Sequence, residues 1–199
     1  ALAKAGLVRV SLNTRETIEN HRYKLDDSGS RACIHGGGWA DLGVEIEFDI
    51  SMLHDMMETG DNTPCSVDRA LDAPLRLGYT GGTTGKSKGV TLTTRGELTE
   101  LLSFLTDLVP GLHENDSFLH AAPIAHASGA FFLPALVRGV RSIVMKKFEP
   151  AEFIKLAEAE QAKMTFLVPT MLSMILEEPG LKDADLNFER ICYGASPIS

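Results

Sequence analysis

The 199-residue sequence contains only three cysteines, one tryptophan and no long apolar run. Cys33, Cys65 and Cys192 show no paired spacing, which predicts free thiols and favours a reducing compartment. The longest apolar run, residues 130–137, is interrupted by Pro134 and falls far short of the ~20 residues that cross a bilayer. Because no signal peptide is evident either, we expect a cytoplasmic protein without a membrane span.

Positive charge is also scarce, since 19 Lys and Arg face 27 Asp and Glu for a net charge of −8. No basic stripe offsets this balance, so nucleic acid and acidic membrane surfaces are not expected partners. The six histidines have no paired spacing with cysteines or carboxylates, which predicts no metal site. Composition leaves a homo-oligomer open.

Both ends of the sequence look interrupted. The first residue is Ala1 rather than methionine, and residues 1–6 resemble the end of a helix. Residues 194–199 stop just after an expected strand. We therefore expect a fragment of a longer protein, incomplete at both ends.

Apolar periodicity and capping residues predict an α/β protein. Strands followed by helices imply a mostly parallel sheet that is flanked by helices on both faces. We expect residues 1–74 to form strand-helix-strand units and a connector, and residues 75–199 to form an ATP- and acyl-binding α/β subdomain. Strands are expected at residues 7–12, 31–35, 41–50, 75–80, 90–93, 117–122, 140–145, 164–168 and 189–193; helices are expected from Asn13 or Thr14 to 26, and at 51–59, 94–108, 127–137, 150–161 and 169–176.

Residues 80–89 form a loop with four glycines, three threonines and two lysines in ten positions. Glycines let successive N–H groups turn toward one anion, and threonine hydroxyls add further donors. The lysines supply positive charge where an ATP tail needs it. A plain surface turn is the alternative, but turns seldom combine so many glycines and threonines. The loop therefore predicts a phosphate site.

The loop is not a P-loop of the Gly-x-x-x-x-Gly-Lys-Ser/Thr type, although Gly85-Lys86-Ser87 copies its ending. That motif needs a glycine at the position of Thr80. It also runs directly into a helix, whereas residues 90–93 are expected to continue as a strand.

Residues 79–90, Tyr-Thr-Gly-Gly-Thr-Thr-Gly-Lys-Ser-Lys-Gly-Val, resemble the phosphate-loop signature of the adenylate-forming superfamily. This AMP-binding group includes acyl-CoA synthetases, luciferases and the adenylation domains of peptide synthetases. Its usual pattern is Tyr-Thr-Ser-Gly-Thr-Thr-Gly-x-Pro-Lys-Gly-Val. This chain departs with Gly81 for the serine and Ser87 for the proline, while the motif lysine, Lys88, is retained.

Two later segments support the resemblance. Residues 123–129 resemble the stretch Pro-Leu-Phe-His-x-x-Gly, in which the histidine lies beside the bound acid; here the histidine is His126, and Ala125 replaces the usual aromatic residue. Residues 193–198 resemble the stretch whose backbone lines the adenine and acid pockets. Residues 165–172 resemble a strand-to-helix passage that we interpret as structural.

The resemblance implies an acid–thiol ligase of the acyl-CoA synthetase type. Such an enzyme uses Mg·ATP to convert a small-molecule carboxylic acid into an acyl-adenylate, and coenzyme A then takes the acyl group. Lys88 and His126 are implied as catalytic residues. The implied nucleotide-binding residues are Thr80, Gly81, Gly82, Thr83, Thr84, Gly85 and Lys88 for the β and γ phosphates, and Gly194, Ala195 and Ser196 for the adenine side.

Other functions stay open at this point. The chain could instead load an amino or aryl acid onto a carrier protein, or bind nucleotide without catalysis. An esterase is suggested by His35 and the glycines 36–38, which copy an oxyanion-hole loop, but the Gly-x-Ser-x-Gly elbow is missing around Ser196. The sequence does not specify the acid, which can be fatty, aromatic or an amino acid.

We expect these 199 residues alone not to form acyl-adenylate at a useful rate. The resemblance implies a later acidic residue that holds the ribose and a lysine in a mobile C-terminal domain, and neither has a position in the sequence. ATP–pyrophosphate exchange by the isolated chain, compared with the full-length protein, checks this. Equal rates would contradict it.

Overall fold

The structure is a computed structural model that describes residues 2–39, 41–61, 63, 65, 67–80, 86–124 and 126–198. It divides into two compact units, Ala1–Leu98 and Thr99–Ser199. The expected division at residue 74 separates segments by function and not by compactness, so it stays a prediction. In the described part of the chain, no helix is both long and apolar enough to pass through a membrane.

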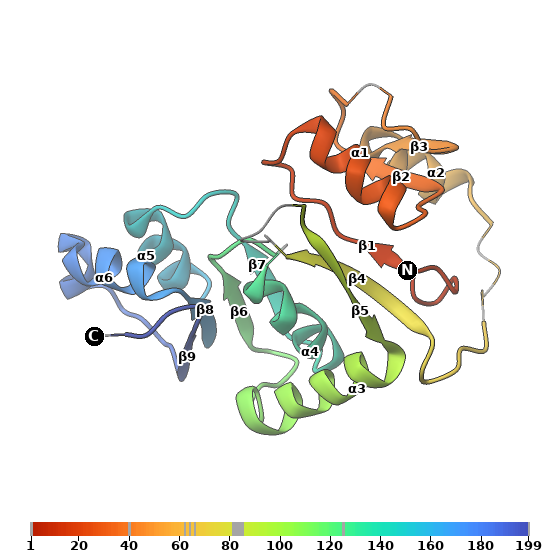
Figure 1. Cartoon of the computed structure of the whole chain (residues 1–199). Coiled ribbons are helices and arrows are strands. Elements are labelled where there is room, and N and C mark those ends of the chain that lie inside the picture. Colours follow the sequence, from red (N-terminus) through yellow and green to blue (C-terminus); the bar gives the residue numbers. More distant parts are fainter. Residues whose placement is uncertain are drawn as a thin grey trace. The chain divides into compact units, whose positions relative to one another are not determined.

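The first unit contains two small sheets (Figure 1). In one, β4 (Pro74–Thr80) lies parallel to β1 (Arg9–Val10) and antiparallel to β5 (Lys88–Thr93). In the other, β2 (Ala32–His35) pairs in parallel with β3 (Ile46–Asp49). The helices are α1 (Ile18–Asp27) and α2 (Leu53–Thr59), the second preceded by a 3₁₀ turn at Ile50–Met52.

Helix α1 begins later than the expected cap at Asn13 or Thr14. The hydroxyl of Thr17 accepts a hydrogen bond from the N–H of Asn20, which makes Thr17 the N-cap. The side chain of Asn13 instead accepts from the N–H of Arg15 at 3.1 Å and closes a turn before the helix. The expected start was wrong because Asn13 satisfies a local turn rather than a helix end.

The strand expected at 41–50 is shorter than its alternation of apolar and acidic residues indicates, and its apolar residues are not all buried. Ile46 is 45% exposed, and Ile34 of the paired strand is 55% exposed. The buried face carries Cys33, which packs with Leu25 and Leu42. Only residues 46–49 form the strand, and the first strand shortens in the same way from 7–12 to Arg9–Val10.

The second unit has a four-stranded parallel sheet in the order β7-β6-β8-β9. Its central strands β6 (Ser117–His120) and β8 (Met164–Leu167) are buried along their whole length. The remaining elements are β7 (Arg141–Val144), β9 (Arg190–Tyr193), α4 (Phe132–Val137), α5 (Pro150–Ala159), α6 (Pro169–Glu177) and 3₁₀ turns at Ala127–Phe131 and Pro179–Asp183.

Helix α3 (Thr94–Ser103) and a π-helical turn at Phe104–Leu108 connect the units in sequence. Thr94 and Glu97 have the spacing of a capping box, but they do not form one. The hydroxyl of Thr93 accepts from the N–H of Gly96 at 3.1 Å, while the carboxylate of Glu97 accepts from Nε of Arg76 at 2.6 Å. The glutamate is held by the neighbouring strand and does not reach back to the helix end.

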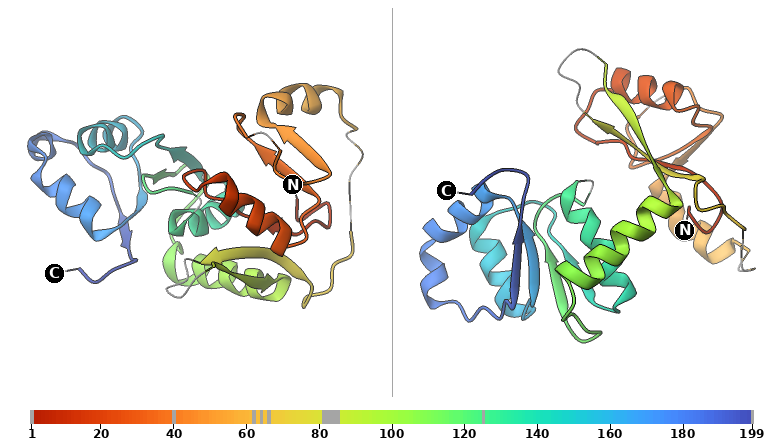
Figure 2. Two further views of the ribbon diagram at one scale, coloured as in Figure 1. Left: turned by 45° about the horizontal axis from the view of Figure 1, so that its top comes forward. Right: turned by 60° about the horizontal axis from the view of Figure 1, so that its bottom comes forward.

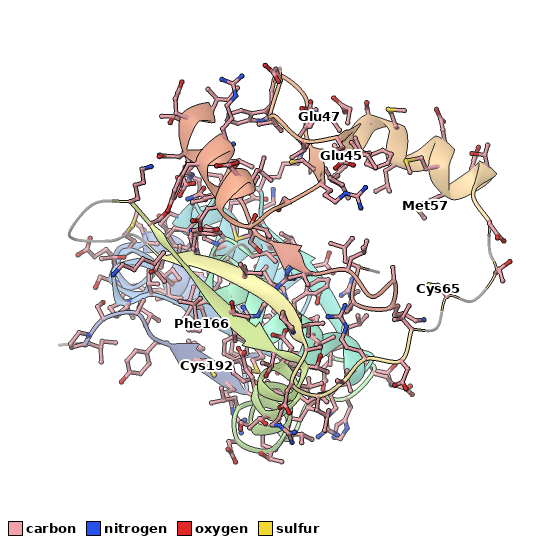
Figure 3. All side chains as sticks on the ribbon, turned by 45° about the vertical axis from the view of Figure 1, so that its right-hand side comes forward. Glu45, Glu47, Met57, Cys65, Phe166 and Cys192 are labelled. Atoms are coloured by element: carbon pink, nitrogen blue, oxygen red, sulfur yellow. The ribbon has the colours of Figure 1, made fainter. Side chains whose placement is uncertain are left out.

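Helices cover both faces of the second sheet, as the sequence predicted. In the right-hand view of Figure 2, α5 and α6 lie on one side and α4 on the other. Alternate residues of β6 divide between the two cores: Phe118 joins the cluster under α4, and Leu119 joins the cluster under α5 and α6. Phe166 and its register partner Cys192 extend the first cluster (Figure 3). The expected α/β class with mostly parallel strands is confirmed.

Candidate functional site

The glycine-rich loop joins two neighbouring antiparallel strands. It leaves β4 at Thr80 and enters β5 at Lys88, and these two residues are register partners. The strand that was expected after the loop is therefore present and excludes the loop-to-helix geometry of a P-loop. Residues 81–85 lie outside the described residues, so the roles expected for Gly81, Gly82, Thr83, Thr84 and Gly85 stay predictions.

The two lysines of the loop differ in their surroundings. The ammonium of Lys86 lies 4.8 Å from the centroid of the Tyr23 ring, on helix α1. Lys88 is exposed at the first position of β5 and forms no ion pair with any residue that the structure describes. The charge of Lys88 is thus available to a ligand, whereas Lys86 is already engaged.

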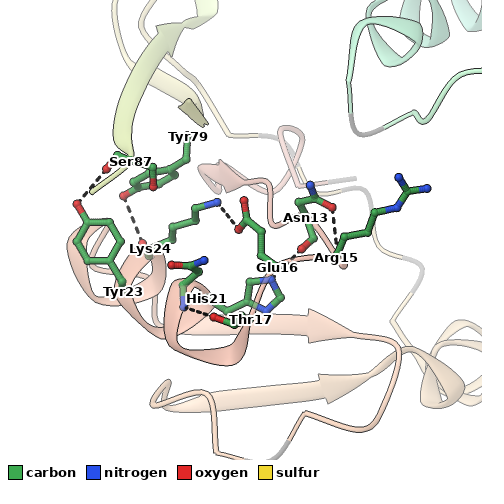
Figure 4. A network of polar contacts seen from close by, with 10 residues as sticks. Asn13, Arg15, Glu16, Thr17, His21, Tyr23, Lys24, Tyr79 and Ser87 are labelled. Carbon is green, nitrogen blue, oxygen red and sulfur yellow. Dashed lines mark hydrogen bonds and ion pairs between the residues drawn. The ribbon is translucent and has the colours of Figure 1, made fainter. Parts of the chain in front are cut away.

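Tyr79, next to the loop, is fixed by helix α1. Its hydroxyl donates to the carboxylate of Asp27 at 2.7 Å. The same hydroxyl lies 3.3 Å from the backbone carbonyl of Lys24, the contact drawn in Figure 4. Burial, followed by the hydrogen bond to Asp27, raises the pKa of Tyr79 to about 12. The phenol consequently stays protonated at neutral pH and keeps its role as a donor.

The other expected site residues belong to the second unit. His126 follows β6, and residues 194–196 follow β9, so both segments leave the carboxyl edge of the parallel sheet. One strand, β8, separates them, which corresponds to roughly 10 Å between strands. From β6 the chain continues to β7 on one side of the sheet, whereas β8 and β9 lie on the other side of β6. Open α/β sheets bind ligands outside the carboxyl ends of the strands at such a switch point.

His126 lies at the start of the 3₁₀ turn Ala127–Phe131. Its N–H donates to the carbonyl of Pro123 at 3.0 Å, and its carbonyl accepts from the N–H of Gly129 at 2.9 Å. The backbone of the residue is therefore fixed on both sides, while its side chain is exposed. This arrangement presents the imidazole at the carboxyl edge of the sheet.

The segment after β9 contains a strained residue. Ala195 has a φ of 74°, in the left-handed region that favours glycine. The peptide N–H of Gly194 donates to the carbonyl of Leu167 at 3.4 Å, which ties the segment to β8. Strain of this kind collects at ligand sites, because surrounding contacts must hold it in place.

Comparison with known proteins decides the family. The family model described as AMP-binding enzyme matches residues 1–199. The chain belongs to the AMP-binding enzyme family.

Its relatives are CoA ligases. A medium/long-chain-fatty-acid–CoA ligase, FadD8 of Mycobacterium tuberculosis, is 38% identical over 138 residues, which cover 67% of this chain and 23% of that protein. The feruloyl-CoA synthase of Amycolatopsis sp is 32% identical over 202 residues, covering 98% of this chain and 40% of the relative. This AMP-binding chain therefore spans less than half the length of these relatives.

A solved structure agrees with the fold. The o-succinylbenzoate CoA synthetase of Bacillus subtilis, in complex with its acyl-adenylate intermediate OSB-AMP, is 27% identical with a TM-score of 0.82. The alignment covers 97% of this chain and 40% of that structure. The predicted membership of the adenylate-forming superfamily is confirmed.

The triple glycine after β2 has a structural explanation in this AMP-binding chain. The N–H of Gly37 donates to Nδ1 of His35 at 3.2 Å, and Gly37 and Gly38 have φ values of 84° and 76°. Nε2 of His35 lies 3.8 Å from the carboxylate of Glu47. The glycines form a tight turn that His35 closes, which explains them without an oxyanion hole.

Sequence reasoning missed His120, a fully buried histidine at the end of β6. Its Nδ1 lies 2.9 Å from the hydroxyl of Ser128, in the same 3₁₀ turn that His126 begins. Its Nε2 is buried without a hydrogen-bond partner among the described residues. Burial lowers the pKa of His120 to about 4, so the imidazole is neutral at physiological pH. A histidine beside the apolar pair Phe118 and Leu119 in this strand was the signal that the sequence offered.

We expect His120 to make the stability of the protein depend on pH. The unfolded chain takes up a proton near the ordinary pKa of 6.5, whereas the folded chain resists it down to about 4. The contribution of His120 to the free energy of unfolding is therefore fully present above pH 6.5 and is lost as the pH falls. Between pH 7 and pH 5 the free energy of unfolding should decrease by about 2 kcal/mol. Urea unfolding of wild type and His120→Asn at both values measures this.

The quantity to compare is the change in the free energy of unfolding between pH 7 and pH 5, because His120→Asn can lower stability at every pH. The variant should lose less stability on acidification than the wild type. Titration of the His120 ring by NMR gives an independent check. Ring signals that titrate near pH 6.5 in the folded protein would rule out the depressed pKa.

Proposed function

We propose that this chain carries the nucleotide-binding part of an acid–thiol ligase, which activates a carboxylic acid with ATP and transfers the acyl group to coenzyme A. The observation that carries the proposal is the match of all 199 residues to the AMP-binding family, with Thr80 and Lys88 paired at the base of the loop. The relatives are named as CoA ligases, which favours coenzyme A over a carrier protein as the acceptor.

In the first step a carboxylate oxygen attacks the α-phosphorus of ATP. The new oxygen–phosphorus bond forms as the bond to the bridging oxygen breaks, and pyrophosphate leaves. The difficulty is the approach of one anion to another, so positioning and charge stabilisation dominate. The exposed ammonium of Lys88 and the hydroxyl of Thr80 would hold the β and γ phosphates, with the predicted donors of residues 81–85 between them.

In the second step the sulfur of coenzyme A attacks the acyl carbon and AMP leaves with the oxygen of the former carboxylate. The exposed His126 would border the acid, and Gly194, Ala195 and Ser196 would line the adenine side. Their common position at the carboxyl edge of the second sheet supports these roles.

Mg²⁺ fits this chemistry as a companion of the nucleotide. The ion commonly binds through substrate phosphates with few protein ligands, and there it would neutralise charge on the phosphate oxygens. We propose that it enters with ATP, so no metal site of the protein itself is invoked. A cytoplasmic location stays part of this proposal.

ATP–pyrophosphate exchange by the full-length protein tests the function. The panel of acids should contain medium- and long-chain fatty acids, ferulate and 2-succinylbenzoate, which the relatives' names suggest. We expect exchange with one class of acid. When coenzyme A is then added, its free thiol should be consumed. Exchange without thiol loss would favour loading of a carrier protein. ATP binding without exchange for any acid would favour a nucleotide-binding module.

A further inference from the structure

The C-terminal half of helix α1 contacts the chain on both sides of the phosphate loop. On the β5 side, the hydroxyl of Tyr23 donates to the carbonyl of Ser87 at 3.0 Å. On the β4 side, the hydroxyl of Tyr79 donates to the carboxylate of Asp27 at 2.7 Å. One helix therefore holds the chain on either side of residues 80–86.

The contact with Ser87 acts directly on Lys88. A carbonyl belongs to the peptide unit that it shares with the next residue, and this unit is planar. The hydrogen bond from Tyr23 consequently fixes the peptide plane that leads into Lys88. Position 87 is also where the family pattern has a proline, so here a tertiary contact restrains a backbone that lacks the ring.

The face of the same tyrosine ring engages Lys86. Its ammonium lies 4.8 Å from the ring centroid, within the range of a cation–π contact. Tyr23 thus contacts two consecutive residues of the loop, one through its hydroxyl and one through its ring. This double contact separates the role of Lys86 from that of Lys88.

Helix α1 is itself firmly anchored. Lys24, whose side chain is 5% exposed, forms an ion pair with Glu16 and lies 5.7 Å from the centroid of the Tyr79 ring. The buried His21 ring lies 2.9 Å, through Nε2, from the carbonyl of Asn13. These hydrogen bonds and the ion pair fix one orientation of helix α1, because a shift of the helix would leave a buried charged or polar group without a partner.

We propose that Tyr23 and Asp27 of helix α1 are positioning residues for the phosphate loop, which orient Lys88 toward ATP and hold Lys86 away from it. The proposal rests on the function proposed above, and it assigns neither residue a contact with substrate. Loss of the Tyr23 hydroxyl should leave the loop present but less well oriented, so the effect should fall on the use of ATP and not on the use of the acid.

Tyr23→Phe tests this in the full-length protein, because it removes the hydroxyl and keeps the ring. We expect kcat/KM for ATP in the exchange reaction to fall about tenfold, with the KM for the acid within twofold of wild type. Tyr23→Leu removes the ring as well, so kcat/KM for ATP should fall further in this variant. The matched control is Arg22→Gln, a neighbouring residue of α1 whose exposed guanidinium bonds the carbonyl of Asp41.

Coupling between residues supplies a second readout. If Tyr23 holds Lys86, the substitution Lys86→Ala should have less effect in the Tyr23→Leu background than in the wild type. On the β4 side, Tyr79→Phe and Asp27→Asn should each lower kcat/KM for ATP, and the double variant should resemble the single ones. A purely structural role would produce additive effects that follow the loss of stability.

Hydrogen exchange of the amides of residues 86–90, measured without ligand, tests the positioning role of helix α1 independently of the proposed ligase function. Tyr23→Phe should accelerate exchange in this segment and leave the second unit unchanged. Unchanged amide exchange, or the same kinetic loss in Arg22→Gln, overturns the positioning role. Absence of ATP–pyrophosphate exchange in the wild type overturns the proposed function instead, and the amide measurement still decides whether helix α1 orders the loop.

Discussion

Replacing Lys88 with alanine in the full-length protein is expected to lower ATP–pyrophosphate exchange about 100-fold. Lys88 is the exposed cation at the first position of β5, opposite Thr80. A charge-assisted hydrogen bond to phosphate contributes roughly 1.5–3 kcal/mol, and a preorganised donor contributes most where charge concentrates in the transition state. Initial rates at saturating acid, over a range of ATP concentrations, measure the loss.

Lys86→Ala is the matched control, because it removes the same charge two residues away. The ammonium of Lys86 rests on the ring of Tyr23, and an exposed contact of this kind contributes about 0.5–1 kcal/mol. We therefore expect only a few-fold effect from this variant. Equal losses in the two variants would falsify the division of roles between the lysines.

Gly129→Ala is expected to disrupt the turn that presents His126. A Cβ at this position would lie 1.9 Å from the carbonyl oxygen of Ile124 and 3.0 Å from its carbon. Both atoms belong to the backbone, so no side-chain rotation relieves the overlap. Inserting one carbon into a packed region commonly costs about 1–3 kcal/mol, and the backbone overlap places this variant at or above about 3 kcal/mol.

The measurement has two parts. Chemical denaturation gives the loss of stability, and exchange assays at sub-saturating acid give the effect on the acid site. Gly180→Ala is the control in the same unit, since nothing lies within 4 Å of a Cβ there. A Gly129→Ala protein with wild-type stability and wild-type KM for the acid would show that the turn tolerates the change and that its geometry is not required.

The regular elements of the second unit were predictable because local signals agree with the tertiary structure. Pro150 occupies the first turn of α5, as its missing N–H allows. Gly139 follows α4 with a φ of 72°, the conformation that a helix end favours. Strands β6 and β8 are short apolar runs that are buried on both faces. In each case a single residue or a short pattern determines the outcome.

The first unit was less predictable because its polar groups have competing partners. Asn13 could cap a helix, but it forms a local turn, and Thr17 takes the cap. Glu97 could complete a capping box, but it pairs with Arg76 from a strand 21 residues earlier. Which partner a side chain takes depends on distances through space, and a sequence does not contain those distances.

The sequence by itself determined the family and predicted a phosphate site in the loop, because the spacing of glycines, threonines and Lys88 is a local property of consecutive residues. Only the tertiary structure decided how that loop is held. The contacts of Tyr23 with Ser87 and of Asp27 with Tyr79 join residues that are 64 and 52 positions apart. The burial of His120, and with it the lowered pKa, likewise arises from helices packed over both faces of the sheet. Such contacts exist only after the chain has folded, since packing and not sequence neighbourhood brings their atoms together.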